Sequence, residues 1–384
     1  MRKMKRFFLG AAAVFMAAAL LSSVPAQAIS AQKAILIDGT TGRVLYEKDA
    51  DSRSLVASTT KIMTALVICE QCNVLDRMRI PKEAVGIEGS SMYLKEGEVL
   101  TLQELLYGLM LSSGNDAAVA LAIYCGGTVE GFVGMMNDKA HMLGLNSTHF
   151  ENPNGLDSPG HYSTARDLAV LTAYAMKNPI FAQTVSTKTI TIGDRVLRNH
   201  NKLLWQVDGA DGVKTGFTKA AGRILVSSAF RDGRRLIAVT INDGNDWKDH
   251  AEMLNEGFSK YSVYQIVTEG EVVGYRAIMG GTESKVTLLA AGNFSYALTE
   301  QEQPYLRYAE PEFAYAPVAS GQEAGYAYVC IGDTAVGKIP LIYGETVEQE
   351  SLPKKHFWQR WFGGKKNDGA LAKNTCIPGT MLPA

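Results

Sequence analysis

Apolar positions in the first part of the chain recur at two different periods. The segments 34–38 and 43–46 are mostly apolar runs on either side of a glycine-containing turn, which predicts a pair of strands. After Ser58, apolar residues recur at helical spacing through Val67. This pattern predicts a helix that opens at the serine itself.

The middle of the chain is predicted to be helical. Thr101 and Glu104 have the spacing of a capping box, and the apolar pattern continues from them toward Ser112. A second spacing of this kind, Thr164 with Asp167, opens another helix. The further helices predicted here are 116–124, 129–143 and 165–176.

After Pro179 the pattern changes to one of strands. The predicted elements are a strand at 187–192, strands at 223–230 and 236–241 on either side of an Asp-Gly hairpin signal, and a helix at about 247–258. Strands therefore stand at both ends of a region that has helices between them. This order predicts an α+β sandwich over residues 29–262, with a sheet built from segments far apart in the chain.

From about residue 263 the chain has short β-rich runs, glycine-rich turns and no convincing helical pattern. The clearest strands are 286–289, 326–331 and 339–342. We therefore predict a small all-β domain at 263–350. The length of the chain also suits two domains better than one.

Both ends of the chain differ from the rest. Residues 1–28 combine four basic residues, an uncharged apolar run and Ala26-Gln27-Ala28, which predicts a signal peptide and an exported, extracytoplasmic protein. In the segment 351–384, the stretch 354–366 mixes cations with bulky aromatic residues. That mixture favours peripheral contact with an anionic membrane surface, although a segment packed on the β domain has the same composition. Beyond Asn367 we expect disorder.

Charge and cysteine content exclude several classes of protein. Removing the predicted signal peptide changes the formal net charge from −1 to −5, because that segment holds four basic residues and no acidic ones. Such a chain lacks the basic surface of a nucleic-acid-binding protein. The five cysteines are an odd number, and Cys69-x-x-Cys72 has no second pair at zinc-site spacing. Packed thiols are the favoured interpretation, with no metal and no cofactor.

Three short motifs stand in a fixed order along the chain: Ser58-x-x-Lys61, Ser113-Gly114-Asn115 and Lys214-Thr215-Gly216. Each is weak alone, and Ser351-x-x-Lys354 also fits the first. Together they form the S-x-x-K, S-x-N and K-T-G set of penicillin-binding proteins and serine β-lactamases. Their order and wide separation point to acyl transfer rather than coincidence.

The residue types explain the chemistry that the first motif can perform. A serine hydroxyl is a poor nucleophile until a base takes its proton, and Lys61 lies one helical turn from Ser58. The amine must be neutral for this task, and burial or a nearby cation such as Lys214 lowers its pKa. The backbone N–H groups of Ser58 and Phe217 are the predicted donors to the oxyanion.

The other two motifs supply the remaining roles. Ser113 is predicted to pass a proton to the leaving amine, and the Asn115 amide to hold the substrate backbone. Lys214 and Thr215 present a cation and a hydroxyl suited to a terminal carboxylate. Gly216 is predicted to let an extended substrate approach the strand closely.

These residues resemble those of the low-molecular-weight penicillin-binding proteins, the D-alanyl-D-alanine carboxypeptidases. The similarity extends from the motifs to Gly89–Met92, 143–157 and 198–204, and more loosely into the β-rich region. It implies a β-lactamase/transpeptidase-like catalytic domain followed by a small all-β domain. By this resemblance Ser58 is the acylated residue, Lys61 the proton acceptor, Ser113 the third active-site residue and Lys214 a substrate contact.

The function expected is that of a serine-type carboxypeptidase that removes the terminal D-alanine from peptidoglycan stem peptides and is acylated by β-lactams. A β-lactamase, a D,D-endopeptidase and a non-catalytic wall-binding protein remain the alternatives. A Ser-His-Asp hydrolase is disfavoured because no G-x-S-x-G occurs, and His161 and His200 are assigned structural roles. Glu151 only faintly matches a β-lactamase deacylation site.

Overall fold

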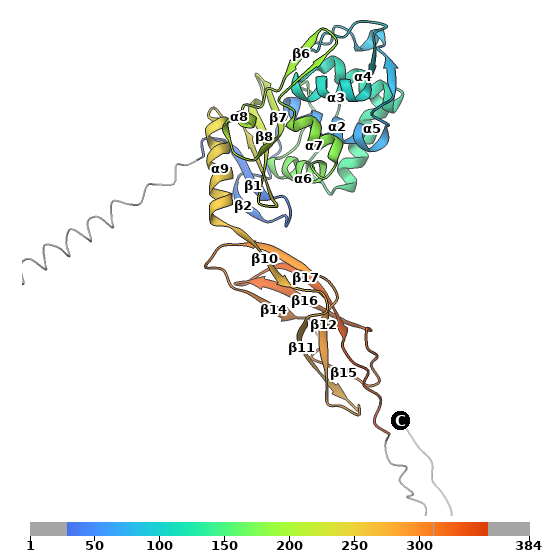
Figure 1. The fold of residues 1–384 in the computed structure, drawn as a ribbon, viewed down its shortest axis with the longest axis vertical. Helices are drawn as coiled ribbons and strands as arrows, with labels where there is room; N and C mark the ends of the chain where they lie inside the picture. Colours follow the sequence, from blue (N-terminus) through green and yellow to red (C-terminus); the bar gives the residue numbers. More distant parts are fainter. Residues whose placement is uncertain (1–28, 310, 352–384) are drawn as a thin grey trace, which may run out of the picture. The chain divides into compact units, whose positions relative to one another are not determined.

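The computed structural model describes residues 29–309 and 311–351, so the predicted signal peptide and nearly all of the predicted tail lie outside the described residues. The chain separates into two compact units (Figure 1). The described residues of the first are 29–267, 293–304 and 331–333, and those of the second are 268–292, 305–309, 311–330 and 334–351.

A five-stranded antiparallel sheet forms the centre of the first unit. Its strands, in spatial order, are β2 (Val44–Lys48), β1 (Lys33–Asp38), β9 (Arg234–Ile241), β8 (Gly222–Arg231) and β7 (Ala210–Thr218). The N-terminal hairpin thus pairs with strands some 200 positions later, as the sequence predicted. The strand β7, which carries the Lys-Thr-Gly motif, is an edge of the sheet.

Helices cover both faces of this sheet (Figure 1). They are α2 (Lys61–Gln71), α3 (Leu102–Leu111), α4 (Asn115–Gly126), α5 (Val129–Met142), α6 (Ala165–Ala175), α7 (Pro179–Ser186), α8 (Leu203–Gln206) and α9 (Asp246–Lys260), with the 3-10 turns η1 (Ala57–Thr60) and η2 (Lys82–Ala84). The α6, α7 and η1 elements contact the sheet, while α9 lies along β1, β8 and β9. The capping box of α3 and the Thr164 cap of α6 are both formed as predicted.

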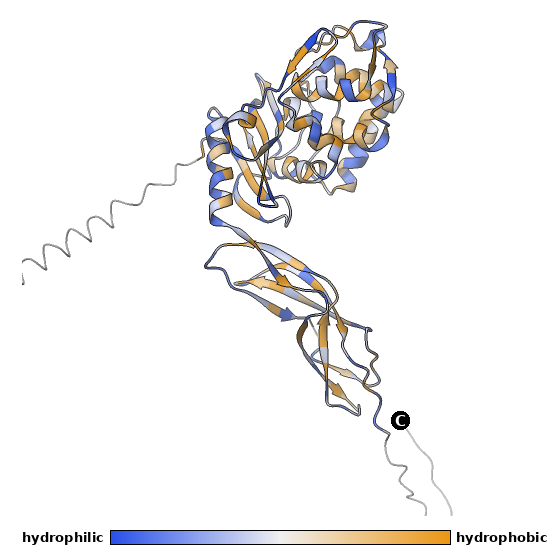
Figure 2. Cartoon of the chain, in the orientation of Figure 1, coloured by the Kyte–Doolittle hydropathy of each residue, from blue (hydrophilic) through white to orange (hydrophobic). Residues whose placement is uncertain are grey.

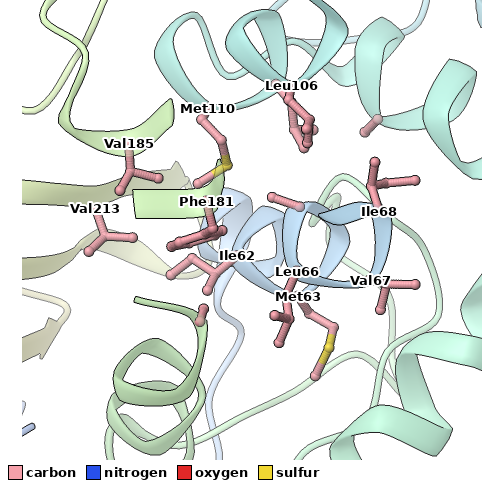
Figure 3. Close-up of a cluster of buried hydrophobic side chains, with 14 of the residues drawn as sticks. Ile62, Met63, Leu66, Val67, Ile68, Leu106, Met110, Phe181, Val185 and Val213 are labelled. Atoms are coloured by element: carbon pink, nitrogen blue, oxygen red, sulfur yellow. The ribbon is translucent and has the colours of Figure 1, made fainter. Parts of the chain in front are cut away.

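The core of this unit surrounds α2 (Figure 3). Every residue from Lys61 to Ile68 in this helix is buried, including the catalytic-motif lysine. Side chains of α3, α7 and β7 close around it, among them Met110, Phe181 and Val213 (Figure 3). A helix buried on all sides holds its first turn rigidly, which fixes the position of the residues just before it.

The helix α9 packs closely on the opposite face of the sheet. A Cβ atom at Gly257 would lie 2.7 Å from Leu236 Cδ1 and 2.8 Å from Leu36 Cδ2, so the absence of a side chain permits this approach. In Figure 2, α9 carries both hydrophilic and hydrophobic segments, as expected for a helix with one buried face. The observed helix runs two residues beyond the predicted 247–258 at its C-terminal end and begins one residue earlier.

Several short elements escaped prediction. They are α7, α8, the two-stranded sheets β3 (Arg77–Arg79) with β4 (Val99–Thr101) and β10 (Ser262–Val267) with β13 (Phe294–Leu298), and the strand β6 (Arg195–Arg198), which pairs with β5 (Thr189–Ile192). The strand expected at 187–192 is β5, which begins two residues later because Thr187 ends α7. Elements of three to eight residues carry few positions in which to show a period.

The second unit is built mainly on a six-stranded sheet. In spatial order its strands are β14 (Pro304–Tyr308), β16 (Glu323–Ile331), β17 (Thr334–Tyr343), β12 (Lys285–Ala290), β11 (Val272–Met279) and β15 (Phe313–Tyr315). The strands predicted at 286–289, 326–331 and 339–342 lie within β12, β16 and β17. Apolar residues of β12, β16 and β17, such as Val286, Ala327 and Leu341, form its core.

Among the described residues, no single helix has both the length and the apolar character needed to cross a bilayer. The pair α4 and α5 passes that test jointly, on length and composition alone, with a bend of 84° between its members.

Candidate active site

The serine of the first motif lies in a strained turn rather than in the α-helix itself. Ser58 belongs to η1, and α2 begins at Lys61. In a 3-10 turn, residues three apart lie almost above one another, so Ser58 and Lys61 share one side. The preceding Ala57 has φ +45°, an uncommon conformation for a residue with a Cβ. Ser58 is half-buried, whereas its neighbours Ala57 and Thr59 are buried.

The amine of Lys61 is fully buried and is surrounded by neutral oxygens. Its Nζ lies 2.9 Å from Ser58 Oγ, 2.7 Å from Asn115 Oδ1 and 2.6 Å from the carbonyl oxygen of Asn154. Burial, followed by the positive charge of Lys214, lowers the Lys61 pKa well below its ordinary value. The predicted pair is thus in contact, and its burial favours the neutral amine that a proton acceptor requires.

The Asn154 loop presses against the nucleophile turn. Gly155 has φ +85°, and a Cβ atom there would lie 1.9 Å from the carbonyl oxygen of Ala57. A side chain at this position would therefore push the loop away from the turn. No residue pattern in this loop indicates that one of its backbone carbonyl groups binds Lys61.

The second motif forms the link between α3 and α4. Ser113 is 4 % exposed and has φ +59°, and Asn115 begins α4. Asn115 Oδ1 accepts from Lys61, while its Nδ2 donates to the Glu88 carbonyl at 2.6 Å. The buried Asp116 accepts hydrogen bonds from Ser91 and from two backbone N–H groups of the 91–94 segment. The amide of Asn115 therefore positions the lysine, and its predicted contact with substrate stays a prediction.

The third motif lies on β7, beside η1. Lys214 is 1 % exposed, its Nζ donates to the Thr215 carbonyl at 2.8 Å, and burial lowers its pKa to about 7. A Cβ atom at Gly216 would lie 3.2 Å from the Val56 carbonyl and 3.3 Å from Ala57 Cβ. The glycine thus allows the strand to approach the nucleophile turn, whereas the sequence interpretation assigned its space to substrate.

A cavity of about 460 Å³ opens above these elements. Ser58, Ser113, Thr215, Gly216 and Phe217 line it, so all three predicted motifs contribute to one site. Lys61 and Lys214 lie buried beside it. The volume is within the range of small-molecule sites in proteins.

Six lining residues were not predicted as part of the site, Ser90 and Ile224 among them. His200 lines the cavity although the sequence interpretation gave it a structural role, and its pKa is lowered by burial and by Lys214. Arg223, Asp246 and Trp247 form another part of the wall. Arg223 follows the hairpin after the Lys-Thr-Gly motif and Asp246 begins α9, so no local pattern connects them.

Two residues considered in the sequence lie elsewhere. Glu151 accepts hydrogen bonds from Ser158 Oγ and from the backbone N–H of Gly160, and it does not line the cavity. His161 Nε2 lies 2.7 Å from Thr60 Oγ1, and burial lowers the pKa of this histidine to about 4. Its contact with the residue before Lys61 agrees with the structural role assigned to it.

The cysteines of the described chain are free thiols. Cys330 is buried, whereas Cys69, Cys72 and Cys125 are only partly buried, so packing is looser than predicted for these three. Burial raises the pKa of the Cys69 thiol to about 12, which makes it a poor nucleophile. Over residues 29–309 and 311–351, no group of three or more His, Cys, Asp or Glu side chains is arranged to hold a metal ion.

A half-buried serine in contact with a buried lysine, beside a cavity and under a lysine-bearing edge strand, defines a serine acyl-transfer enzyme that uses lysine as its base. Comparison with known families agrees with this class. The family model for D-alanyl-D-alanine carboxypeptidases, peptidase family S11, matches residues 20–245. The model for the C-terminal domain of penicillin-binding protein 5 matches residues 261–349. The chain belongs to the D-alanyl-D-alanine carboxypeptidase family.

Individual relatives are similar along most of the chain. The D-alanyl-D-alanine carboxypeptidase DacD of Salmonella typhimurium is 35 % identical over 340 residues, which cover 83 % of this chain and 87 % of the relative. The D-alanyl-D-alanine carboxypeptidase DacF of Bacillus subtilis is 34 % identical over 317 residues, covering 77 % and 80 %.

Among solved structures, penicillin-binding protein 5 of Haemophilus influenzae matches with a TM-score of 0.74 and 29 % identity, over 84 % of this chain and 98 % of that one. The predicted fold class, the resemblance to low-molecular-weight penicillin-binding proteins and the enzyme class are confirmed by these comparisons.

Proposed function

We propose that this chain removes the terminal D-alanine from peptidoglycan stem peptides through an acyl-enzyme on Ser58. The observation that carries the proposal is the environment of Lys61. A neutral amine has two N–H bonds and one lone pair. Two amide oxygens, of Asn115 and Asn154, accept the N–H bonds, so the lone pair is left for the hydroxyl proton of Ser58.

Acylation follows from this arrangement. Ser58 Oγ attacks the carbonyl carbon of the penultimate D-alanine while its proton passes to Lys61. The backbone N–H groups of Ser58 and Phe217 stabilise the negative oxygen of the tetrahedral intermediate. Ser113 relays this proton from Lys61 to the amine of the departing D-alanine, so that Lys61 is neutral again and Ser113 keeps its hydroxyl. Its positive φ supports a functional role, because strained backbone is retained where the site requires it.

Water then hydrolyses the ester and releases the shortened peptide. A β-lactam has the same acyl centre, so it acylates Ser58, but its leaving group stays attached. The proposal therefore assigns slow deacylation to β-lactams and names them as inhibitors.

The test is release of free D-alanine from a stem pentapeptide, together with labelling by a fluorescent penicillin. The wild-type chain is expected to do both. Ser58→Ala is expected to do neither while it retains the wild-type melting temperature. Ser259→Ala is the matched control, because Ser259 is an exposed serine of α9. Labelling of the Ser58→Ala protein would contradict the proposal.

The same assays separate the alternatives. Turnover of the penicilloyl adduct within seconds indicates a β-lactamase, and cleavage of dimeric muropeptides indicates an endopeptidase. Absence of both D-alanine release and labelling in the wild-type chain would leave a wall-binding protein.

Export is part of the proposal and rests on the sequence of residues 1–28. The stretch 354–366 adds weak peripheral contact with the outer face of an anionic membrane. Binding of the full chain to vesicles with and without anionic lipid, compared with a chain ending at residue 350, tests the second point.

A further inference from the structure

The segment that begins at Ile29 is packed against the start of α9. Ile29 is 9 % exposed and Ala31 is fully buried, and both belong to the core cluster on the α9 side of the sheet. Lys48 Nζ donates to the carbonyl oxygen of Ile29 at 3.1 Å and to that of Ala31 at 2.7 Å. The segment that follows the predicted cleavage point is therefore fixed on the fold.

Two buried carboxylates lie beside Ser30. Asp243, between β9 and α9, is 1 % exposed, and Asp249, in the first turn of α9, is 4 % exposed. Ser30 donates its backbone N–H to Asp249 Oδ2 at 2.6 Å. Its Oγ lies 2.8 Å from Asp243 Oδ1 and 2.8 Å from Asp249 Oδ2, and its one proton serves only one of them at a time. The two carboxylates therefore share a single serine side chain.

This pair has no countercharge in the described part of the chain. None of the ion pairs formed by residues 29–309 and 311–351 includes Asp243 or Asp249. Asp243 Oδ2 is buried and accepts no hydrogen bond from those residues. Burial raises the pKa of Asp243 and the charge of Asp249 adds to the rise, although hydrogen bonds from Ser30 and Asn245 oppose it. The N-terminal end of α9 supplies only partial positive charge, so a full cation would stabilise the pair.

The other titratable groups around Ile29 have partners of their own. The Lys48 amine is bonded to the two carbonyl oxygens named above. The Tyr46 hydroxyl stays neutral, because burial and then the charge of Asp249 raise its pKa. A neighbouring pocket that Ile29 lines contains charged residues of α9 that are already paired, Lys260 with Glu256 at 2.6 Å and Glu252 with Lys248 at 3.7 Å.

Cleavage after Ala28 creates a new cation at this place. Hydrolysis of the bond between Ala28 and Ile29 by a signal peptidase consumes one water, leaves a carboxylate on Ala28 and frees the Ile29 nitrogen, which takes up a proton. Successive backbone nitrogens lie no more than about 3.6 Å apart, so this nitrogen is within about 6 Å of Asp249 Oδ2. In the uncleaved chain the same nitrogen is an uncharged amide.

We propose that the Asp243–Asp249 pair binds the α-ammonium group of Ile29 once the signal peptide has been removed. The inference rests on the export that forms part of the proposed function. Asp246 and Trp247, which line the active-site cavity, follow Asp243 by three and four positions. The ion pair therefore anchors the start of α9 and, with it, one wall of the cavity in the mature chain.

The first test titrates the new terminus. A chain of residues 29–384, released from a cleavable fusion so that it begins at Ile29, is compared with a chain that begins at Ala26. The pH dependence of acetylation of the terminal amine is followed by mass spectrometry of the N-terminal peptide. The midpoint of this profile is the readout, because burial alone slows the reaction without moving the midpoint upward.

The two carboxylates stabilise the charged amine of the Ile29 chain. Its midpoint is expected at about pH 9 or above, while the Ala26 chain keeps the ordinary value near pH 8. Equal midpoints in the two wild-type chains would overturn the inference. This measurement needs no substitution, so it does not depend on the folding of a variant.

The second test asks whether Asp243 is the partner. The Ile29 chain is expected to melt about 2–6 °C above the Ala26 chain, and Asp243→Asn is expected to remove most of that difference. Asp138→Asn, at an exposed position of α5, is the control and should keep the difference. An undiminished difference in Asp243→Asn would contradict the assigned site.

The inference and the proposed function can fail separately. A raised midpoint in a chain that releases no D-alanine would support the terminus site and contradict the peptidase assignment. N-terminal sequencing of the exported protein tests the cleavage itself. A mature chain that begins anywhere other than Ile29 would contradict the inference while leaving D-alanine release unaffected.

Discussion

The two faces of the five-stranded sheet surround cationic side chains with opposite kinds of partner. On the face toward α2, the amines of Lys61 and Lys214 are surrounded by hydroxyl, amide and carbonyl oxygens, and both pKa values fall. On the face toward α9, the guanidinium of Arg223 is paired with the carboxylate of Asp246.

This contrast shows that the groups in contact with a cationic side chain, and not burial alone, decide its chemical role. Burial disfavours the charged form, and a nearby carboxylate restores it. An amine among neutral oxygens becomes a proton acceptor, as required of Lys61. An arginine paired with a carboxylate keeps its positive charge and its planar set of donors, as at Arg223.

The largest expected effect comes from replacing Lys61, on the α2 side, with arginine, the type of cation found on the α9 side. Lys61→Arg places a permanent cation near Ser58, and the guanidinium cannot give up its proton at any working pH. We expect the rate constant for acylation by a penicillin to fall by about 10³-fold or more, since general-base catalysis contributes up to about 10⁴-fold. Stopped-flow or mass-spectrometric acylation kinetics measure this loss.

Lys61→Arg changes both the shape and the basicity of the side chain at position 61, so the two effects must be separated. Lys61→Gln provides the comparison, because it is neutral and has no basic nitrogen. If Lys61→Arg acylated faster than about a tenth of the wild-type rate, the proton-acceptor role of Lys61 would have to be abandoned.

His250 sharpens the comparison, because it lies on the α9 face without a carboxylate contact. Its Nδ1 is 2.6 Å from Ser227 Oγ and its Nε2 is 3.0 Å from Thr240 Oγ1, and burial lowers its pKa from 6.5 to about 3. Since the folded pKa lies below the unfolded one, the unfolded chain binds more protons in this window. The free energy of unfolding therefore falls as pH drops from 6.5 toward 3.

We expect His250→Gln to remove this dependence, which amounts to about 1.4 kcal/mol per pH unit for one proton. Urea unfolding at pH 6.5, 5.5 and 4.5 measures the slope. His141→Gln, at an exposed position near the end of α5, is the control and should keep the wild-type slope. Equal slopes in all three proteins would show that His250 is charged in the fold.

Much of this architecture was predictable where a long period or a motif marks it. The apolar spacing after Ser58, the capping boxes and the Asp-Gly hairpin each predicted an element that the structure contains. The contact of Ser58 with Lys61 followed from local spacing in the same way, because residues three apart meet on any helical turn.

The rest depends on contacts between distant segments. The carbonyl of Asn154 binds Lys61 across 93 positions, and a main-chain oxygen leaves no trace in residue type. The pairing of Arg223 with Asp246 joins a strand to a helix terminus through the fold of the intervening hairpin. The order of residue types along the chain therefore predicts neither of these two contacts.

A smaller effect is expected from Lys214, which tests the coupling between the two buried amines. Its positive charge contributes, after burial, to the lowered pKa of Lys61. Lys214→Gln removes that charge and should raise the Lys61 pKa, so the rising limb of the pH–acylation profile moves to higher pH by roughly one unit. Lys219→Gln, exposed just beyond the same strand, should leave the limb in place. If the rising limb of the profile moved in neither variant, burial alone would account for the lowered pKa of Lys61.

The smallest expected effect comes from the opposite substitution, arginine to lysine, at position 223 on the α9 side of the sheet. Arg223→Lys keeps a positive charge beside Asp246 but presents a point charge in place of a planar set of donors. We expect acylation by benzylpenicillin to slow by about threefold to tenfold, with the preference for this free acid over its methyl ester retained, because an ammonium still attracts a carboxylate. The same kinetic assay measures both quantities. If the preference disappeared altogether, the planar set of donors rather than the charge would be the property that matters at position 223. If Lys61→Arg and Arg223→Lys both retained the wild-type acylation rate, the neighbouring groups would not decide the role of the cation on either face.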